Sequence, residues 1–350
     1  MILTTFALFI SSFMSLFVFR KFAILINLVD QPNARKQHSG SIPLVGGLAV
    51  FIVVFSYLII FPNTISSAML YLSCASILLF VGVLDDLYDI SFRFRLILQI
   101  VISALMMLFG GLILNNVGAI FGDVNVNLSF FGYMMTVICV VGAINAFNMV
   151  DGIDGLLGAL ATITFSSLGI LFYFNGQSEL MAFCAAIVVA TIPYILMNLG
   201  IPLGQRFKIF MGDAGSTVIG FTVVWLLLEG SQSTDRAFSP VTALWLAAVP
   251  IIDAVSTIAR RVKKGQSPFK PDREHLHHIL LRLGFSSRQA LVVICFISAS
   301  LAVIGVLGDV FNIPEYIMFY AFIVLTVMYY FFMLRIWRIS VRIRRLFKVQ

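Results

Sequence analysis

The 350-residue sequence is poor in charge, because Asp, Glu, Lys and Arg make up only 11% of it while 60% of its residues are hydrophobic. A soluble globular domain usually carries about 25% charged residues. Long apolar runs recur along the chain and leave no room for a separate soluble domain of ordinary size. The composition therefore predicts an all-α, polytopic integral membrane protein.

Cysteine and histidine are also scarce, at four residues each. Every cysteine lies inside an apolar run and none has C-x-x-C spacing, which argues against disulfides and cysteine-bound metal. The 23 basic residues outnumber the 16 acidic ones. They gather in short loops between apolar runs, as topology signals do, so we expect membrane lipid and no nucleic acid as a partner.

Eleven apolar stretches are each about long enough to cross a bilayer as a helix. They cover residues 1–19, 44–61, 68–84, 96–114, 131–147, 156–174, 179–197, 214–230, 240–258, 289–308 and 314–334. We expect one transmembrane domain over 1–334 and a basic tail over 335–350. Arg20 and Lys21 follow the first stretch, the reverse of the charge order in a cleaved signal, so this stretch is expected to remain as a span.

Threading the chain through eleven spans assigns each charged residue to one of the two membrane faces. Of the 23 basic residues, 22 fall on one face and only Arg236 falls on the other. The positive-inside rule makes the first face cytoplasmic, with the N-terminus outside and the C-terminus in the cytoplasm. Six aspartates at the ends of apolar stretches share the cytoplasmic face: Asp85, Asp86, Asp89, Asp151, Asp154 and Asp213. Carboxylates beside a bilayer are costly without a partner or a function, so we expect a divalent cation and a phosphorylated substrate there.

The first acidic motif, Asp85-Asp86-Leu87-Tyr88-Asp89, ends the third stretch. Spacings of three and four residues let pairs of these carboxylates share a helix face. The negative end of a helix dipole disfavours them, so structure alone gives little reason for three. The motif predicts a site for Mg²⁺ or a phosphate-bearing reactant, with a solvated helix end as the alternative.

The second and third motifs are Asn145–Gly155, between the fifth and sixth stretches, and Phe210–Ser216, which opens the eighth. The former carries the oxygen-bearing residues Asn145, Asn148, Asp151 and Asp154, which are typical ligands of a hard cation or a nucleotide. The latter places Asp213 at an expected helix N-terminus, where phosphate can bind. Asp154 and Asp213 could instead each be an N-cap.

The fourth motif contains Arg273, His275, His277 and His278 in the inner loop 259–288. Zinc and a solvated polar loop are alternatives, although no cysteine or H-E-x-x-H is present. We favour a basic, hydrogen-bonding lid over a pyrophosphate, with one histidine able to exchange protons. Asp253, inside the ninth stretch, is expected to form a buried ion pair with a nearby arginine, and a supporting role at the site is the alternative.

These motifs, in this order, resemble the polyprenyl-phosphate N-acetylhexosamine-1-phosphate transferase family, which is glycosyltransferase family 4. The resemblance runs from about Leu28 to Leu307 and includes Val29–Asn33, Pro43–Gly47 and Pro268–Arg273. The peptidoglycan branch tends to carry three consecutive histidines. Leu276 interrupts that run here, which favours the branch that uses UDP-GlcNAc.

The resemblance implies transfer of GlcNAc-1-phosphate from UDP-GlcNAc to undecaprenyl phosphate, with release of UMP. This is the first membrane step of O-antigen and enterobacterial common antigen (lipopolysaccharide) synthesis, on the cytoplasmic side of the bacterial inner membrane. It implies Mg²⁺, for which Mn²⁺ can substitute, held by Asp213 and Asn148. It assigns catalysis to Asp85, Asp86, Asp151 and Asp154. The implied substrate-binding residues are Arg95, Asn145, Asp151, Asp154, Arg273, His275, His277 and His278.

Several alternatives stay open at this point. The donor could be another UDP-N-acetylhexosamine, the enzyme could be a phospho-MurNAc-pentapeptide transferase, and a transporter is the non-enzymatic alternative. The resemblance also admits a homodimer. A phosphate monoester is mostly dianionic at pH 7, so we expect direct attack by the lipid phosphate, positioned by Asp85 or Asp86, rather than a covalent aspartyl intermediate.

Overall fold

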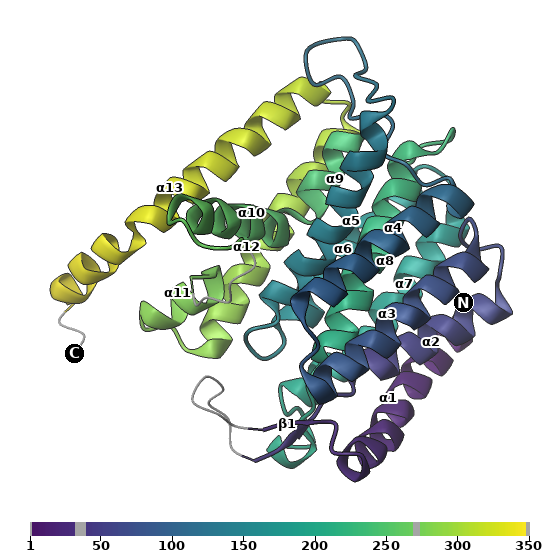
Figure 1. Cartoon of the computed structure of the whole chain (residues 1–350), viewed down its shortest axis with the longest axis vertical. Coiled ribbons are helices and arrows are strands. Elements are labelled where there is room, and N and C mark those ends of the chain that lie inside the picture. Colours follow the sequence, from purple (N-terminus) through teal and green to yellow (C-terminus); the bar gives the residue numbers. More distant parts are fainter. Residues whose placement is uncertain (1, 32–39, 269–273, 348–350) are drawn as a thin grey trace.

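The structure is a computed structural model that describes residues 2–31, 40–268 and 274–347 (Figure 1). Arg273, one of the predicted substrate-binding residues, lies outside the described residues. The described chain is almost entirely helical. Its helices are α1 (Ile2–Leu25), α2 (Gly46–Ile60), α3 (Ala68–Tyr88), α4 (Phe92–Gly110), α5 (Phe131–Val150), α6 (Leu156–Phe174), α7 (Ser178–Asn198), α8 (Gly212–Gln232), α9 (Pro240–Leu246), α10 (Ala248–Lys263), α11 (Leu276–Arg282), α12 (Ser287–Val310) and α13 (Glu315–Phe347). The strands β1 (Val29–Asp30) and β2 (Ile42–Pro43) pair antiparallel, and a 3-10 turn, η1, covers Gln205–Phe207.

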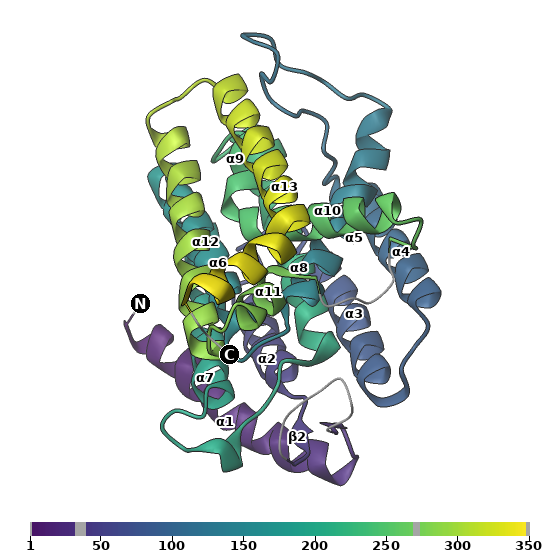
Figure 2. The same ribbon diagram turned by 90° about the vertical axis from the view of Figure 1, so that its left-hand side faces the viewer.

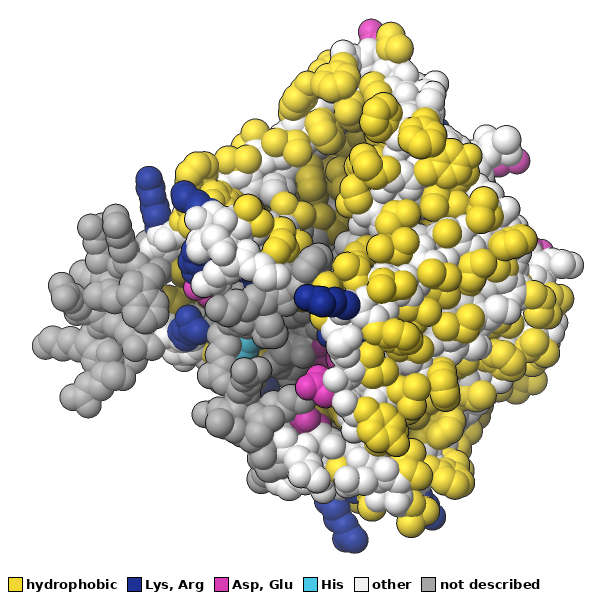
Figure 3. All heavy atoms as spheres, in the orientation of Figure 1, with side chains coloured by type: hydrophobic (Ala, Val, Ile, Leu, Met, Phe, Trp, Pro, Cys, Tyr) yellow, Lys and Arg dark blue, Asp and Glu magenta, His cyan; other side chains and the backbone are white. Residues whose placement is uncertain are grey.

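Nine helices of the described chain are long and apolar enough to cross a membrane, namely α1, α3, α4, α5, α6, α7, α8, α12 and α13. A tenth is added if α9 and α10 count as one span, whereas α2 is apolar but has only 15 residues. Apolar side chains cover most of the right-hand part of Figure 3, whereas a group of acidic side chains and a histidine lie near the middle of the view. The prediction of an all-α, polytopic membrane protein is confirmed.

The stretch 240–258 was predicted as one span, and this prediction is wrong in one respect: α9 and α10 meet at an angle of 85°. Pro250 in the first turn of α10 has no N–H to donate to the carbonyl of Leu246. The Thr164 hydroxyl on α6 donates to that carbonyl instead, over 3.1 Å. The chain therefore breaks at Ala247 without leaving the Leu246 carbonyl unpaired.

Helix α8 forms the centre of the bundle, because 89% of its apolar window is buried. It packs between α3, α5 and α2. Small residues make the approach close: a Cβ added to Gly82 of α3 would overlap the backbone of Ala214, and one added to Gly47 of α2 would overlap Gly215. Such contacts are typical of helix pairs in membranes, where packing replaces the hydrophobic effect.

The C-terminal helices form a second group. Figure 1 shows α10, α11 and α13 to one side of the bundle that contains α1–α8, and Figure 2 shows α12 and α13 side by side. Helix α12 packs on α6 and α9, while α13 contacts α9 and α10. Helix α13 continues without a break from its apolar part into the segment 335–347 that was predicted as a tail.

The end of the bundle away from the acidic motifs carries the loop between α4 and α5. Asn116 and Asn127 form an antiparallel bridge there, so this loop contains a short hairpin. Arg236, the one basic residue predicted to lie opposite the others, is 3.7 Å from Glu315 at this end. The Glu315 carboxylate also accepts a hydrogen bond from the backbone of Ala119.

We expect Gly82→Ala to destabilise the protein, because the added methyl group would push α3 away from Ala214. Overpacking of this kind costs about 1–3 kcal/mol. The midpoint of thermal unfolding of detergent-solubilised protein should fall by several degrees. Gly142→Ala on α5 is the matched control, since its new Cβ meets nothing within 4 Å. An equal fall in both variants would contradict the close packing of α3 on α8.

Candidate active site

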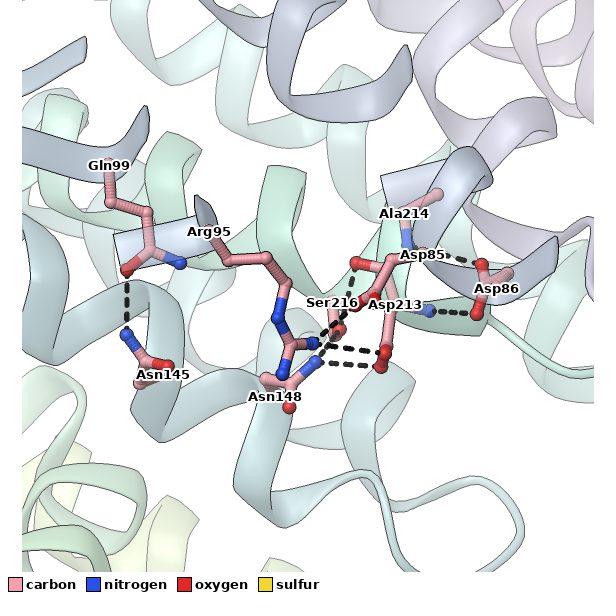
Figure 4. A network of polar contacts seen from close by, with 9 residues as sticks. All are labelled: Asp85, Asp86, Arg95, Gln99, Asn145, Asn148, Asp213, Ala214 and Ser216. Carbon is pink, nitrogen blue, oxygen red and sulfur yellow. Dashed lines mark hydrogen bonds and ion pairs between the residues drawn. The ribbon is translucent and has the colours of Figure 1, made fainter. Parts of the chain in front are cut away.

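Three connections that are distant in sequence meet at one end of the bundle: the α3–α4 turn, the α5–α6 loop and the segment before α8. Arg95 on α4 lies 3.4 Å from Asp213 at the start of α8. Lys208, just before α8, lies 2.7 Å from Asp154 in the α5–α6 loop. The motifs therefore come together at one end of the bundle, and Figure 4 shows the part of this cluster that lies on α3, α4, α5 and α8.

Arg95 bridges two carboxylates at the centre of the site. Its Nη1 donates to Oδ2 of Asp85 and also lies near Oδ2 of Asp213. The Asp85 side chain is only 2% exposed, whereas that of Asp213 is 42% exposed. Burial of the Asp85 charge would be costly alone, and the guanidinium compensates for it. Asp213 is the carboxylate of this pair that solvent and a ligand can reach.

Asp86 makes a different set of contacts from its neighbour. Its Oδ1 accepts a hydrogen bond of 2.9 Å from the backbone N–H of Asp213, and its Oδ2 accepts one of 3.4 Å from Ala214. The Asp86 carboxylate on α3 thus caps the N-terminus of α8. The dipole of α8 also favours a negative charge at this end. The backbone turns here at Gly212, whose φ of +79° suits glycine.

Asn148 joins the site from α5, which extends to Val150 and so includes three residues beyond the predicted end of the stretch at 147. Its Nδ2 donates to Oδ1 of Asp213 over 2.8 Å and to the hydroxyl of Ser216 over 3.0 Å. Asn145, one turn earlier, donates to Oε1 of Gln99 over 2.8 Å. Gln99 and Ser216 were not predicted as site residues, although each lies about one turn from a predicted residue on its helix.

The α5–α6 loop carries Asp151 and Asp154. Asp151 ends α5, and the Asp154 carboxylate pairs with Lys208 while 37% of it stays exposed. The buried side chain of Asn198 holds this loop, since its Oδ1 accepts from Gly155 N over 2.5 Å and its Nδ2 donates to Ile209 over 2.7 Å. Asn198 therefore ties the loop to the segment that leads into α8, a role that its position at the end of an apolar helix did not signal.

The histidines approach from the C-terminal group. His275 precedes α11 and its Nδ1 lies 2.8 Å from Oδ2 of Asp253 on α10. The His277 ring lies so close to Gly152 that a Cβ there would overlap it. The ring centroids of His277 and His278 are 4.2 Å apart. The contacts of Asp253 thus run to the histidine segment, whereas an ion pair with a nearby arginine was expected.

Burial, and to a smaller extent the neighbouring His278 and His275, lower the pKa of the His277 imidazole to about 3. An unperturbed histidine has a pKa near 6.5. His277 is therefore neutral at pH 7 and presents one N–H and one lone pair rather than a positive charge.

The sequence was compared with those of known proteins. The model of "Glycosyl transferase family 4" matches residues 68–231, which run from the start of α3 to the end of α8. Proteins named undecaprenyl-phosphate alpha-N-acetylglucosaminyl 1-phosphate transferase are similar over nearly the whole chain. The one from Yersinia pestis is 49% identical over 97% of this chain and 93% of its own, and the one from Escherichia coli K12 is 47% identical over 97% and 92%. The one from Haemophilus influenzae is 44% identical over 98% and 97%.

The chain belongs to glycosyl transferase family 4. The part matched by the family model contains Asp85, Arg95, Asn148, Asp151 and Asp213, but not the histidine segment. The relatives extend the likeness through α9–α13. In this family 4 protein, the residues that meet around Asp213 thus belong to the family core, and the histidines reach them from the C-terminal group.

The pKa of His277 predicts a pH dependence of stability. The folded pKa lies below the unfolded one, so the unfolded chain binds more protons between about pH 6.5 and pH 3. The contribution is fully present above pH 6.5 and is lost as the pH falls. Between pH 7 and pH 5 the unfolding midpoint of the wild type should fall about 2–4 °C more than that of His277→Gln. Measurement at pH 8 gives the packing effect alone, and parallel curves would refute the assignment.

Proposed function

We propose that the protein transfers GlcNAc-1-phosphate from UDP-GlcNAc to undecaprenyl phosphate and releases UMP. The relatives named for this transfer support the proposal, because they match at least 97% of the chain. The observation that carries it is the meeting of Asp213, Asn148, Asp85 and Arg95 at the end of an apolar helical bundle. That arrangement combines oxygen ligands with a guanidinium, as transfer between two phosphates requires.

Asp213 and Asn148 would hold Mg²⁺, with Mn²⁺ as a substitute. No group of three or more His, Cys, Asp or Glu side chains in the described part of the chain is arranged to hold a metal. Mg²⁺ is compatible with a site of fewer protein ligands, because it usually takes one or two carboxylates and completes its shell with water and substrate phosphate oxygens. The exposed carboxylate of Asp213 beside an amide has this chemistry. When bound, Mg²⁺ would offset the charge of the two reacting phosphates.

The nucleophile would be an oxygen of the acceptor phosphate itself. This phosphate is mostly dianionic at pH 7 and needs no strong base, so one of its oxygens can attack the β-phosphorus of the donor directly, with UMP as the leaving group. Asp85, whose side chain is only 2% exposed, would orient the acceptor phosphate through Arg95, whereas the Asp86 carboxylate accepts from the backbone of α8. Arg95 can stabilise the negative charge that accumulates between the two phosphates.

The donor would lie toward the α5–α6 loop. Lys208 beside Asp154 and the neutral ring of His277 beside Gly152 supply a cation and a hydrogen-bonding group near one another. Asp151 directly precedes Gly152 in the same loop. A nucleotide diphosphate bound there would have its transferable phosphorus directed toward Asp213.

The acceptor chain would run along α10. After the 85° bend, α10 packs on α5 and carries the exposed apolar side chains Val255, Ile258 and Val262, which are 49%, 36% and 58% exposed. Spacings of three and four residues place them on one face. This face offers a prenyl chain a lipid-accessible path toward the site. The positive-inside rule supports a cytoplasmic site in the inner membrane of a bacterium.

The product would be GlcNAc-diphospho-undecaprenol, as in the first membrane step of O-antigen or enterobacterial common antigen synthesis. The same geometry would accept another UDP-N-acetylhexosamine, because the phosphate chemistry is identical. Release of UMP from a panel of UDP-sugars, with and without undecaprenyl phosphate, identifies the donor. UMP release that does not require the lipid, or transport without release, would overturn the proposal.

Asp213→Asn should reduce UMP release by at least about 100-fold, because it removes the exposed carboxylate of the proposed Mg²⁺ site. Activity is measured with purified protein across a range of Mg²⁺ concentrations. Asp123→Asn is the matched control, since Asp123 is an exposed acid in the hairpin at the opposite end. An unchanged unfolding midpoint would show that Asp213→Asn is folded. Near-normal activity at ordinary Mg²⁺ would refute the metal assignment.

A further inference from the structure

Asp253 is a buried carboxylate that the proposed reaction does not use. It lies on α10, is only 2% exposed and accepts three hydrogen bonds. The donors are the Tyr329 hydroxyl of α13 at 2.6 Å, His275 Nδ1 at 2.8 Å and the backbone N–H of Leu276 at 3.2 Å. A single carboxylate thus joins α10, α13 and the start of α11.

We propose that Asp253 and Tyr329 are positioning residues for the donor end of the active site. They hold His275, and through it His277, against the Asp151–Gly152 segment. This proposal rests on the proposed function, which places the uridine nucleotide at the donor end of the active site. Neither residue touches the substrate in this arrangement, since both act through the histidine segment.

The hydrogen bonds define the state of His275. The Asp253 carboxylate is an acceptor only, so the Nδ1 of His275 carries a proton and donates it. Carboxylate–imidazole pairs of this kind fix both the tautomer and the ring orientation. The Leu276 N–H fixes the backbone of the same segment, and Arg260 adds a bond of 2.7 Å to the Glu274 carbonyl. The histidine segment is therefore held to α10 at consecutive residues.

The constraint passes from His275 to His277. The two rings are parallel within 6° and their centroids are 5.9 Å apart. His277 is 2% exposed and lies against Gly152. Its Nε2 has no hydrogen-bond partner within the described residues. A buried polar atom of this kind favours a ligand group that can pair with it, and a small shift of α11 would move it away from the donor.

A substitution of Tyr329 can distinguish a positioning role from a direct role in the reaction. Its hydroxyl completes the set of donors around a buried charge, and Tyr329→Phe removes one oxygen while leaving the ring. Loss of a hydrogen bond to a charged group typically corresponds to about tenfold or more in affinity. We expect the KM for UDP-GlcNAc to rise roughly tenfold, with kcat and the KM for undecaprenyl phosphate within about twofold of wild type.

Three variants provide the controls. Tyr330→Phe makes the same change one residue further along α13 and should leave every kinetic constant unchanged. Asp309→Asn alters another carboxylate that joins two helices, through Ser239 and Thr242, at the opposite end. It should leave the ratio of the two KM values unchanged. Asp253→Asn should raise the donor KM more than Tyr329→Phe does, and Asp253→Glu should restore part of the loss.

The outcomes are distinct. An unchanged donor KM in folded Tyr329→Phe, or parallel changes in both KM values and kcat, would overturn the positioning role and leave a structural tie between helices. A wild type that does not release UMP from UDP-GlcNAc would instead overturn the proposed function. In that case calorimetric binding of UMP to the wild type and Tyr329→Phe tests the positioning by itself: weaker binding to the variant supports it and equal binding refutes it.

Discussion

The hydrogen bonds from the first turn of α8 to the Asp86 carboxylate are the constraint on which the site depends. They join the end of one helix to the beginning of another and fix the direction in which α8 leaves the site. Helix α8 is buried over most of its length and packs on α2 and α3 through glycine and alanine, so it has little freedom to tilt. Asp213, on its first turn, is held with comparable rigidity. A rigid carboxylate is what a metal and two phosphates need, since errors of about 1 Å are costly in phosphoryl transfer.

The site is shared between two groups of helices with different tasks. The bundle of α1–α8 supplies Asp85, Arg95, Asn148 and Asp213, which lie where the phosphates would react. The C-terminal group supplies the histidines, and it meets the bundle at Gly152. The bend between α9 and α10 allows this division, because it turns α10 across the end of α5 and brings Asp253 beneath the histidine segment.

Much of the site could be predicted from the sequence. Motifs at the ends of apolar stretches that share one face of a membrane are confined to one end of the bundle, and Asp85, Arg95, Asn148 and Asp213 do meet there. The direction of each side chain could not be predicted this way. Asp85 and Asp86 are neighbours of identical chemistry, yet one pairs with an arginine and the other caps α8, because the difference depends on how α3 packs against α8.

The remaining differences have the same origin. Pro250 allowed for a break near Ala247, but at the 85° turn the hydroxyl of Thr164 on α6 also donates to the Leu246 carbonyl in place of the missing N–H. Asp253 and two arginines share a helix, which made an ion pair a reasonable prediction. The carboxylate instead contacts His275 and Tyr329, residues 22 and 76 positions away. Contacts between distant segments of this kind leave no periodic signal in the sequence.

Arg95 gives the site a property that concerns the whole catalytic cycle. Its guanidinium bridges Asp85 and Asp213 from within the chain, so the acidic cluster carries its own counter-ion. When products leave, the guanidinium remains beside both carboxylates and offsets part of the repulsion between them. The same guanidinium can turn from one carboxylate toward an incoming phosphate, so a positive partner is present for whichever anion the site holds. Arg95 thus acts as a resident counter-ion of the Asp85–Asp213 pair in both the empty and the occupied site.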